Sequence, residues 1–469
     1  MKPIQLKTLP FAFFFLLCGM SHFVTAKNSK GKQPNILFIF SDDWGWGDLG
    51  VHGHPYIKTP NLDRLAKEGT DFQRFTVASG VCSPSRTAVM TGQFPARHNV
   101  DGHFAWVPQN EKRNMPDWVD PKTTLLPRLL QKAGYATAHF GKWHISNNMI
   151  PDSPSPMEYG YDEYGAFNCS GEQMPVHQDA DRAIAFIEKS HSKGKPFFIN
   201  LWVHEPHTPF HVVPKYQQKY PQFDAESSDN IYASVLTHAD ERIGEVLNAL
   251  DRLGLTENTL VIFSSDNGPA GSGEPNQEFK VIYDSATGLG YDSKAARGTT
   301  GGRKGRKASI YEGGICVPFI ARWPKKIKAN AIDNTSLISA VDLLPTFCEI
   351  AGAKLPSSYT PDGLSQLETL KGKAYPVREK PLFWKIKTKY AKGQFQYAIV
   401  YQNWKLLISE DRSIVELYDV VADPYEKNNL KDSKKEKADE LIAKIDAWMA
   451  TLPEKPSPKL FSKLREENN

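Results

Sequence analysis

The sequence predicts an α/β fold with a doubly wound sheet, followed by a smaller C-terminal α+β domain. Residues 35–41 form a continuous apolar run of strand length, which is typical of a strand buried on both faces of a parallel sheet. Helical patterns then alternate with further strand-like runs, as expected for a doubly wound domain. A chain of 469 residues is long enough for two such domains.

The elements of the first domain follow in order along the chain. A short helix is predicted from Asn61, as its N-cap, to a stop at Gly69. Further strands are predicted at residues 136–140, 196–203, 259–265 and 317–322, and helices at residues 124–133, 179–190 and 230–253. Residues 268–308 are rich in Gly, Ser and Lys with little periodicity, which predicts a long functional loop.

The C-terminal part has a different pattern. Residues 356–380 are rich in Pro, Gly and Ser and are interpreted as a connector between domains. Short strands are predicted beyond it at residues 397–401, 404–409 and 414–420, and a helix at residues 434–450. We therefore place the large domain at residues 27–360 and the small α+β domain at residues 378–469.

Residues 1–26 are predicted to be an export signal. Lys2 and Lys7 precede an apolar run at residues 11–17, and small residues at 24–26 offer a cleavage site. The run is too short to span a bilayer; a buried N-terminal strand is the alternative. Cys18 stands in a poor lipobox, so lipoprotein anchoring is the less favoured interpretation. We expect a periplasmic or secreted protein with no membrane span.

Charge and cysteine content narrow the function classes. The chain has 57 Lys and Arg against 53 Asp and Glu, so it does not bind nucleic acid by bulk charge. Without the predicted signal, four scattered cysteines remain, and none has metal-binding spacing. Each is expected to be a buried small apolar residue unless its local sequence indicates otherwise. These cysteines are Cys82, Cys169, Cys316 and Cys348.

Polar side chains follow four of the predicted strands directly. Because ligands bind at the carboxyl ends of strands in open parallel sheets, these groups should converge on one site. The four pairs are Asp42 with Asp43, Lys142 with His144, His204 with His207, and Asp266 with Asn267. The oxygen ligands among them suit Ca²⁺ or Mg²⁺ rather than Zn²⁺.

The segment around Cys82 is the most informative. Pro84 suits the first turn of a helix, which would place Cys82 at a helix N-terminus, where a thiol pKa falls. A buried cysteine before a helix, with a solvated Arg86, is the alternative. The longer pattern C-x-P-x-R-x-x-x-M-T-G is rare by chance.

Residues 82–92 (CSPSRTAVMTG) resemble the signature of the type I, formylglycine-dependent sulfatases. In that family the cysteine is oxidised after translation to 3-oxoalanine (formylglycine). Other segments match the family in the same order: residues 35–48, 59–69, 141–144 (GKWH), 266–268 (DNG), 312–314 (EGG) and 416–430. The resemblance implies an alkaline-phosphatase-like catalytic domain, a small antiparallel-sheet domain and a formylglycine-generating maturation enzyme as partner.

The resemblance also implies roles for individual residues. One hydroxyl of the hydrated aldehyde at Cys82 would attack sulfur, helped by Asp266, and the other would then expel sulfate. Arg86 would stabilise the formylglycine, Lys142 would bridge it to the sulfate, and His144 would accept a proton from the second hydroxyl.

The remaining implied roles concern the leaving group, the sulfate and the cation. His207, in the segment EPHTP, would protonate the departing alcohol, whereas His204 and His211 would be structural or substrate-selecting. Lys307, five residues before Glu312, would bind sulfate. The implied cation is Ca²⁺, with Mg²⁺ as the alternative, held by Asp42, Asp43, Cys82, Asp266 and Asn267.

The expected substrate is a sulfated carbohydrate, of the algal polysaccharide or glycosaminoglycan type. Five positive charges at Arg297, Arg303, Lys304, Arg306 and Lys307 indicate either a solvated loop or an electropositive rim for a polymer with several sulfates. The C-terminal tail is expected to close one side of the cleft. Two alternatives remain: a phosphomonoester or phosphonate monoester hydrolase of the same superfamily, and an inactive polysaccharide-binding protein.

Overall fold

The computed structural model describes Met1 and residues 33–274, 277–373, 378–387 and 395–467. Gln33–Asn469 form one compact unit, and the description below is confined to it. Apart from Met1, the predicted export signal at residues 1–26, with Cys18, lies outside the described residues. No helix among the described residues combines the length and the apolar character needed to cross a membrane.

An eight-stranded sheet forms the centre of this unit, in the order β11-β2-β10-β7-β1-β6-β4-β5. Its five-stranded parallel part comprises β7 (Thr259–Ser265), β1 (Asn35–Ser41), β6 (Phe197–Trp202), β4 (Ala136–Lys142) and β5 (Glu163–Phe167). The remaining strands are β10 (Phe319–Arg322), antiparallel to β7, then β2 (Thr70–Phe72) and β11 (Ala331–Asp333). The predicted α/β class is confirmed, with a mixed edge.

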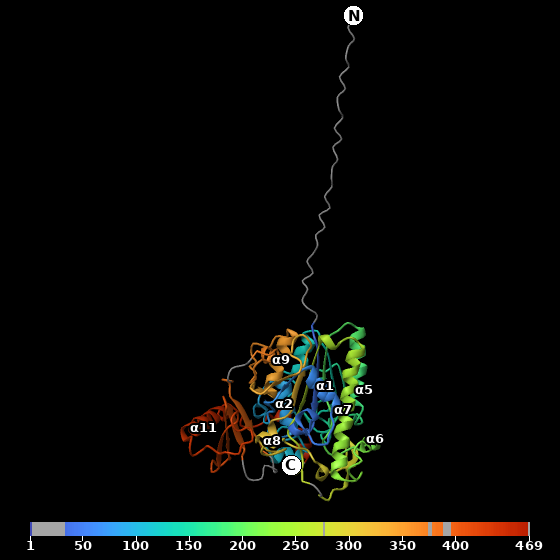
Figure 1. The fold of residues 1–469 in the computed structure, drawn as a ribbon. Helices are drawn as coiled ribbons and strands as arrows, with labels where there is room; N and C mark the ends of the chain where they lie inside the picture. The colour runs from blue at the N-terminus through green and yellow to red at the C-terminus, as the bar shows by residue number, and fades with distance from the viewer. Residues whose placement is uncertain (2–32, 275–276, 374–377, 388–394, 468–469) are drawn as a thin grey trace. The chain divides into compact units, whose positions relative to one another are not determined.

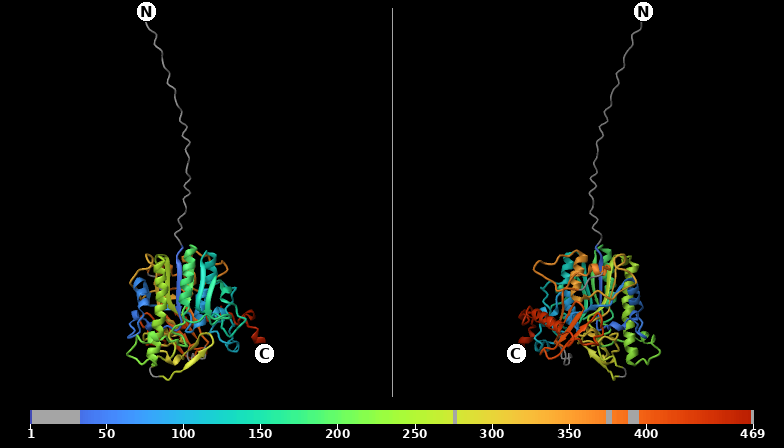
Figure 2. Two further views of the ribbon diagram at one scale, coloured as in Figure 1. Left: turned by 90° about the vertical axis from the view of Figure 1, so that its right-hand side faces the viewer. Right: turned by 60° about the vertical axis from the view of Figure 1, so that its left-hand side comes forward.

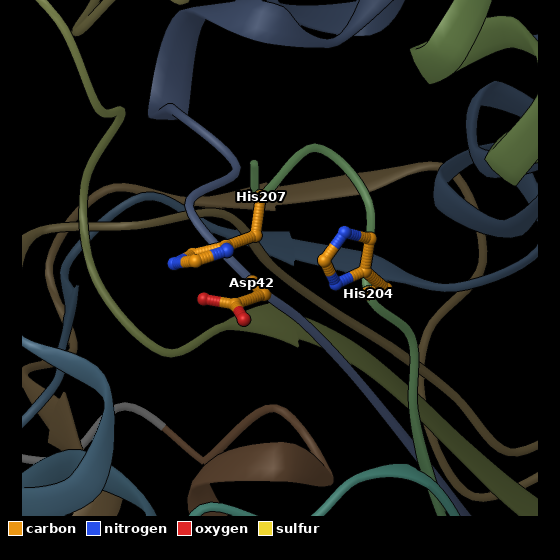
Figure 3. Close-up of side chains that lie close together, drawn as sticks. All are labelled: Asp42, His204 and His207. Atoms are coloured by element: carbon orange, nitrogen blue, oxygen red, sulfur yellow. The ribbon is translucent and has the colours of Figure 1, made fainter. Parts of the chain in front are cut away.

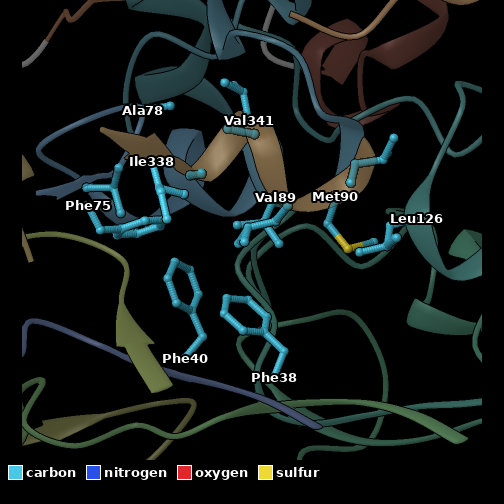
Figure 4. Close-up of a cluster of buried hydrophobic side chains, with 14 of the residues drawn as sticks. Phe38, Phe40, Phe75, Ala78, Val89, Met90, Leu126, Ile338 and Val341 are labelled. Atoms are coloured by element: carbon cyan, nitrogen blue, oxygen red, sulfur yellow. The ribbon is translucent and has the colours of Figure 1, made fainter. Parts of the chain in front are cut away.

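The central strand β1 explains why the sheet is buried on both faces. All seven of its residues are buried, and successive side chains point to opposite faces. Phe38 and Phe40 belong to one apolar cluster, together with Val89, Met90 and Leu126, as Figure 4 shows. Leu37 and Ile39 belong to a second cluster on the other face.

Helices cover each face of the sheet (Figure 1). The second cluster takes its helical side chains from α1 (Pro60–Glu68), α5 (Asp179–Ser192) and α7 (Ser228–Arg252). The first cluster takes most of its own from α2 (Cys82–Thr91), α4 (Leu126–Lys132) and α9 (Leu343–Ala351). This arrangement is the doubly wound layering that the alternating pattern predicts.

The start of α1 differs from the prediction. The helix begins at Pro60 with Thr59 as its N-cap, because proline is pre-organised for the first helical position. Asn61 therefore lies inside the helix, where its side-chain Nδ2 donates a 2.9 Å hydrogen bond to Asp240 of α7. The predicted stop at Gly69 is confirmed.

The C-terminal sheet is four-stranded and antiparallel. It comprises β13 (Leu382–Lys385), β14 (Tyr397–Tyr401), β15 (Trp404–Ile408) and β16 (Val415–Asp419). Helix α11 (Lys435–Met449) packs on one face through Leu441 and Ile445. The opposite face, with Trp384, joins the first apolar cluster of the large sheet, and Trp384 Nε1 donates to the carbonyl oxygen of Val77 at 2.8 Å.

The interpretation of residues 356–380 as a connector is wrong for its described part. Helix α10 (Leu367–Leu370) places Leu367 and Leu370 in the first apolar cluster. Arg378 is buried and donates to both carboxylate oxygens of Asp342, at 2.8 and 2.9 Å. The composition suggested a loop, but tertiary packing fixes this segment against the large sheet.

The expected loop at residues 268–308 contains a hairpin, of β8 (Val281–Asp284) and β9 (Gly288–Tyr291), drawn yellow in Figure 2. Tyr291 exchanges two backbone hydrogen bonds with Phe210, so the hairpin is anchored to the segment after β6. The shorter elements are β3 (Phe75–Thr76), β12 (Ile338–Ser339), α3 (Val107–Lys112), α6 (Pro214–Gln217), α8 (Glu312–Ile315) and α12 (Leu464–Glu467).

Replacing Arg378 by alanine is expected to lower the free energy of unfolding by about 3 kcal/mol, because Asp342 would keep a buried charge without its partner. Urea denaturation measures the change. Lys325→Ala, which removes the highly exposed pair with Glu257, is the control and should change stability by less than ~0.5 kcal/mol. Equal effects of the two substitutions would contradict the packed position of Arg378.

Candidate active site

A cavity of about 830 Å³ opens at the carboxyl ends of the parallel strands. Side chains from four separate strand ends meet at or below it, as the sequence pattern predicts. Of the side chains predicted for the site, those that line the cavity are Asp43, Cys82, Lys142, His144, His204, His207 and Lys307. Asp42, Arg86, Asp266 and Asn267 are completely or almost completely buried and interact with these residues.

Asp42 and Asp43 follow β1 and face different partners. Asp42 accepts a hydrogen bond from the Lys142 ammonium group at the end of β4. Asp43 has a φ of 69°, and its backbone N–H donates to Asp266 Oδ1 at 3.3 Å. Asp43 Oδ1 accepts from Asn267 Nδ2 at 2.6 Å, so the ends of β1 and β7 are tied together.

Arg86 and Asp266 form a fully buried pair. Arg86 Nε and one terminal nitrogen donate to Asp266 Oδ2 at 2.9 and 2.6 Å, and the other terminal nitrogen donates to the Lys142 carbonyl oxygen at 3.0 Å. A buried charge is costly without such partners. The pair therefore fixes the first turns of α2 against β7 and β4.

Cys82 is the first residue of α2, as Pro84 predicts, and its sulfur lies 3.9 Å from Lys142 Nζ. Burial raises the pKa of the thiol to about 11, despite Lys142 and Lys307, which act to lower it. The prediction of a lowered thiol pKa is wrong, because desolvation outweighs the helix N-terminus. All four cysteines in the described residues are buried and free, as predicted.

His144 follows β4 at a φ of 54°, and its Nε2 lies 2.9 Å from the Phe104 carbonyl oxygen. A carbonyl can only accept, so Nε2 carries the hydrogen and Nδ1 keeps a lone pair. Burial and the nearby Lys142 hold the pKa of His144 well below its usual range. In the described part of the chain Nδ1 has no hydrogen-bond partner, so it is free to accept a proton.

His207 and His204 stand near the Asp42 carboxylate, as Figure 3 shows. His207 Nδ1 donates to the Thr208 carbonyl oxygen, which leaves Nε2, 3.9 Å from Asp43 Oδ2, pointing toward the carboxylates. Burial lowers the pKa of His207 well below its usual value, although Asp42 acts to raise it. His204 Nε2 lies 3.2 Å from the Pro209 carbonyl oxygen, which holds this ring in the loop after β6.

Lys307, and not Lys304, lines the cavity. Its ammonium nitrogen lies 2.6 Å from Asp43 Oδ1. Lys304 instead contacts Glu416 and Tyr418 of the C-terminal sheet, at 3.1 and 3.0 Å. The two lysines therefore lie where the motif spacing predicts.

The EGG turn presses against the DNG segment. A Cβ on Gly268 would lie 1.9 Å from the Gly313 carbonyl oxygen, so only glycine allows this approach. Glu312, which begins α8, accepts a 2.8 Å hydrogen bond from the buried ammonium group of Lys405 in β15. Lys405 also contacts Glu426 at 3.0 Å, and this triad joins the C-terminal sheet to the active site.

The oxygen groups fit a divalent cation. Among the described residues, Asp42 Oδ1 and Asn267 Oδ1 are buried without a hydrogen-bond partner, as expected of ligand atoms. Carboxylate and amide oxygens suit Ca²⁺ and Mg²⁺. The three carboxylates at Asp42, Asp43 and Asp266 are balanced by Arg86, Lys142 and Lys307, so a bound cation would give the site a net positive charge.

Most of the five basic residues that indicate either a solvated loop or an electropositive rim have structural partners. Arg297 pairs with Asp229 at 2.9 Å, and Arg303 lies over the Trp46 ring at 3.7 Å. Arg306 donates to three backbone carbonyl oxygens, of Ala270, Gly271 and Gly298. Of the five basic residues, all of which the structure describes, Lys307 alone lines the cavity.

Much of the cavity wall comes from residues that no sequence motif marks. His103, Gln109, Asn147, Asn148 and Tyr283 line it, and they lie in loops and a hairpin without recognised motifs. A short run of β-branched and aromatic residues at 281–283 was the one signal for the hairpin.

The C-terminal tail does not line the cavity in the part that the structure describes. Its Arg465 donates instead to Asp117 at 2.7 Å, and α12 packs against α3. Since Gln109 of α3 lines the cavity, the tail supports this wall from behind.

A family model described as Sulfatase matches residues 34–353. The chain belongs to the sulfatase family. A second family model, described as N-sulphoglucosamine sulphohydrolase, C-terminal, matches residues 305–455. Together the matches include both sheets of this sulfatase and every residue assigned to the site, so the chain hydrolyses sulfate esters.

Similar proteins include sulfatases from mammals and bacteria. The N-acetylgalactosamine-6-sulfatase of Mus musculus is 32% identical over 75% of this chain and 69% of its own length. The N-acetylgalactosamine-6-O-sulfatase of Bacteroides thetaiotaomicron is 28% identical, with 92% and 96% covered. The crystal structure of Ps i-CgsB in complex with k-i-k-neocarrahexaose is 26% identical, with 93% and 96% covered and a TM-score of 0.76.

Removing divalent cations with a chelator is expected to abolish activity and lower the melting temperature of this sulfatase, and Ca²⁺ should restore both more fully than Mg²⁺. Asn267→Leu deletes one oxygen ligand and should weaken Ca²⁺ binding by about 100-fold. Calorimetric titration of the chelated protein measures the affinity, with the exposed Asp432→Asn as control. Unchanged Ca²⁺ affinity in Asn267→Leu would refute the cation site.

Proposed function

We propose that this sulfatase removes sulfate from a sulfated carbohydrate, with formylglycine formed from Cys82 as the nucleophile and Ca²⁺ as the cation (Mg²⁺ the alternative). The observation that carries the proposal is the position of Cys82. It begins α2, faces the cavity and lies 3.9 Å from Lys142 Nζ, beside the oxygen groups that fit a cation. The inactive polysaccharide-binding alternative gives no reason for this arrangement.

The residues around Cys82 supply the proton transfers and the charge stabilisation. Lys142 and Lys307 donate hydrogen bonds to sulfate oxygens, where negative charge develops. A bound cation polarises the sulfate group and neutralises developing charge. His144 Nδ1, free of hydrogen bonds from described residues, accepts the proton from the second hydroxyl of hydrated formylglycine.

His207 is the general acid in this proposal. Its Nδ1 is held by the Thr208 carbonyl oxygen, so Nε2 is the atom that delivers a proton to the departing alcohol. Nε2 must first be protonated. Asp42 favours the charged ring, whereas Lys142 and Lys307 oppose it. Binding of an anionic substrate to the lysines reduces their opposition and favours the protonated ring.

Maturation must precede folding, since Cys82 is 3% exposed and its neutral thiol lies beneath the cavity. The formylglycine-generating enzyme therefore acts on the unfolded chain as the protein is exported to the periplasm or beyond. This order explains why a folded, unmodified protein would stay inactive.

A carbohydrate substrate is supported by the cavity wall. Gln109, Asn147 and Asn148 offer amide groups to sugar hydroxyls, and Tyr283 on the β8–β9 hairpin is 73% exposed at the rim. An exposed aromatic ring suits stacking on the apolar face of a sugar. The relatives named N-acetylgalactosamine-6-sulfatase favour a 6-sulfated N-acetylhexosamine, and the carrahexaose complex favours an algal galactan.

Cys82→Ala is expected to reduce sulfate release from sulfated polysaccharides and oligosaccharides by at least about 1,000-fold, because the nucleophile is lost. Cys82→Ser should be similarly impaired, since it has one hydroxyl and no second to expel sulfate. Ion chromatography measures free sulfate after co-expression with a maturation enzyme, and peptide mass reports the state of Cys82. Cys348→Ala, another buried cysteine, is the control that should stay active.

The same assay tests the rival phosphate chemistry. A solved phosphonate monoester hydrolase shares the fold with a TM-score of 0.59 at 19% identity, which shows the fold alone. A higher kcat/KM on phosphate esters than on matched sulfate esters would replace the proposal. Full activity of Cys82→Ala would reject the formylglycine mechanism.

Tyr283→Ala is expected to raise KM about fivefold on a sulfated oligosaccharide, as lost stacking of ~1 kcal/mol predicts, and to leave KM on a small aryl sulfate unchanged. Val281→Ala, on the same hairpin and 57% exposed but outside the cavity lining, is the matched control. Steady-state kinetics measures the KM of each variant on both substrates. Equal changes on both substrates would mean that Tyr283 supports the fold of the hairpin instead of binding sugar.

A further inference from the structure

A second group of metal-binding side chains lies beside the active site. His177, Glu205 and His238 each offer one nitrogen or oxygen atom, and these atoms all lie within 4.8 Å of one another. His177 precedes α5, Glu205 lies in the loop after β6, and His238 lies in the middle of α7. The sulfatase chemistry described above gives these three residues no role.

One buried polar atom of this cluster has no protein partner among the described residues, and two others pair with each other. His238 is 7% exposed, and its buried Nδ1 has no hydrogen-bond partner among the described residues. Glu205 is 5% exposed, and its Oε1 lies 2.9 Å from His177 Nδ1. A buried imidazole nitrogen without a partner, on a ring that lies beside a carboxylate and a second imidazole, has the character of a ligand atom.

The backbone holds the cluster in place. His177 has a left-handed φ of 69°, and its carbonyl oxygen accepts a 3.2 Å hydrogen bond from Arg242. The ring centroid of His177 lies 4.4 Å from that of His238. Tyr216 stacks on the His238 ring, with the two centroids 4.6 Å apart. A strained, tightly packed position of this kind is retained where it serves a function.

Charge favours a cation at this place. Asp179, 5% exposed, interacts electrostatically with both Glu205 and His177. The nearby Arg242 is already engaged, since it pairs with Asp181 at 2.7 Å and also contacts Glu245. His177 is the partner of Glu205 when its ring is protonated, and a divalent ion in place of that proton would supply positive charge to both buried carboxylates.

We propose that His177, Glu205 and His238 bind a zinc ion. Two imidazoles and one carboxylate are a typical zinc ligand set, and they leave one of the four tetrahedral positions for water. The oxygen-rich site at Asp42, Asp43 and Asn267 prefers a hard cation, so the two sites select different metals.

The ion would join three elements around the histidines of the active site. Glu205 stands between His204 and His207 in the same loop, so a zinc–Glu205 bond fixes that loop to α7 and to the start of α5. Zinc binding itself is independent of the proposed function, whereas its positioning effect rests on the role of His207. Zinc at this site stabilises the loop and acts as a positioning element.

Zinc titration of the purified full chain, with Ca²⁺ in excess to occupy the oxygen-rich site, tests the proposal. One equivalent of Zn²⁺ is expected to bind, and Co²⁺ in its place should give the intense visible bands of tetrahedral coordination. His238→Gln and Glu205→Gln should each weaken Zn²⁺ binding at least about 100-fold and remove the Co²⁺ bands. The exposed His191→Gln is the matched control and should bind as the parent does.

Two further measurements separate the outcomes. Asn267→Leu should keep the zinc affinity, because it alters the other site; loss of zinc binding in this variant would overturn the proposal. Absence of Zn²⁺ binding by the parent, or unchanged binding by both cluster variants, would also overturn it. Melting curves in chelator, expected to agree within a few degrees, show that each variant folds. Zinc binding without sulfatase activity would contradict the proposed function alone.

Discussion

The buried pair of Arg86 and Asp266 is the interaction on which the active site depends. Neither side chain contacts solvent, so each charge is stable only because the other is present. The pair also joins three elements that are far apart in the chain. Arg86 lies in α2 and Asp266 follows β7, and Arg86 also donates a hydrogen bond to the Lys142 carbonyl oxygen at the end of β4. The position of Cys82, four residues before Arg86, follows from this pairing.

A balance of charges extends this arrangement across the cavity floor. Lys142 contacts Asp42, and Lys307 contacts Asp43, so every cation has a carboxylate beside it. Such a site holds its charged groups in fixed positions before substrate arrives, which is the condition for electrostatic catalysis. Because these carboxylates take the place of water around Lys142 and Lys307, the two ammonium groups exchange carboxylate oxygens for sulfate oxygens when a sulfate group enters.

The sequence could predict the parallel strands and the convergence of the site. Residues 35–41 and 259–265 form continuous apolar runs, and strands of that kind place their carboxyl ends together. The β8–β9 hairpin and the packing of Arg378 were not predictable, because short exposed strands and polar segments have weak patterns. The partners of Arg303 and Arg306 could not be predicted either: whether a basic residue faces solvent, a ring or a carbonyl depends on the tertiary fold. The raised pKa of Cys82 could not be predicted for the same reason, since the depth at which a residue is buried depends on the tertiary fold and not on the local sequence.

The buried triad of Lys405, Glu312 and Glu426 has a consequence for how the molecule can be divided. Lys405 belongs to the C-terminal sheet, whereas Glu312 begins the turn whose glycine presses on Gly268, next to Asn267. A chain shortened before β15 would leave Glu312 without its ammonium partner, and the turn behind the proposed cation ligands would lose its anchor. The C-terminal sheet thus supports the catalytic centre, and a shortened chain without that sheet would not keep the centre in place.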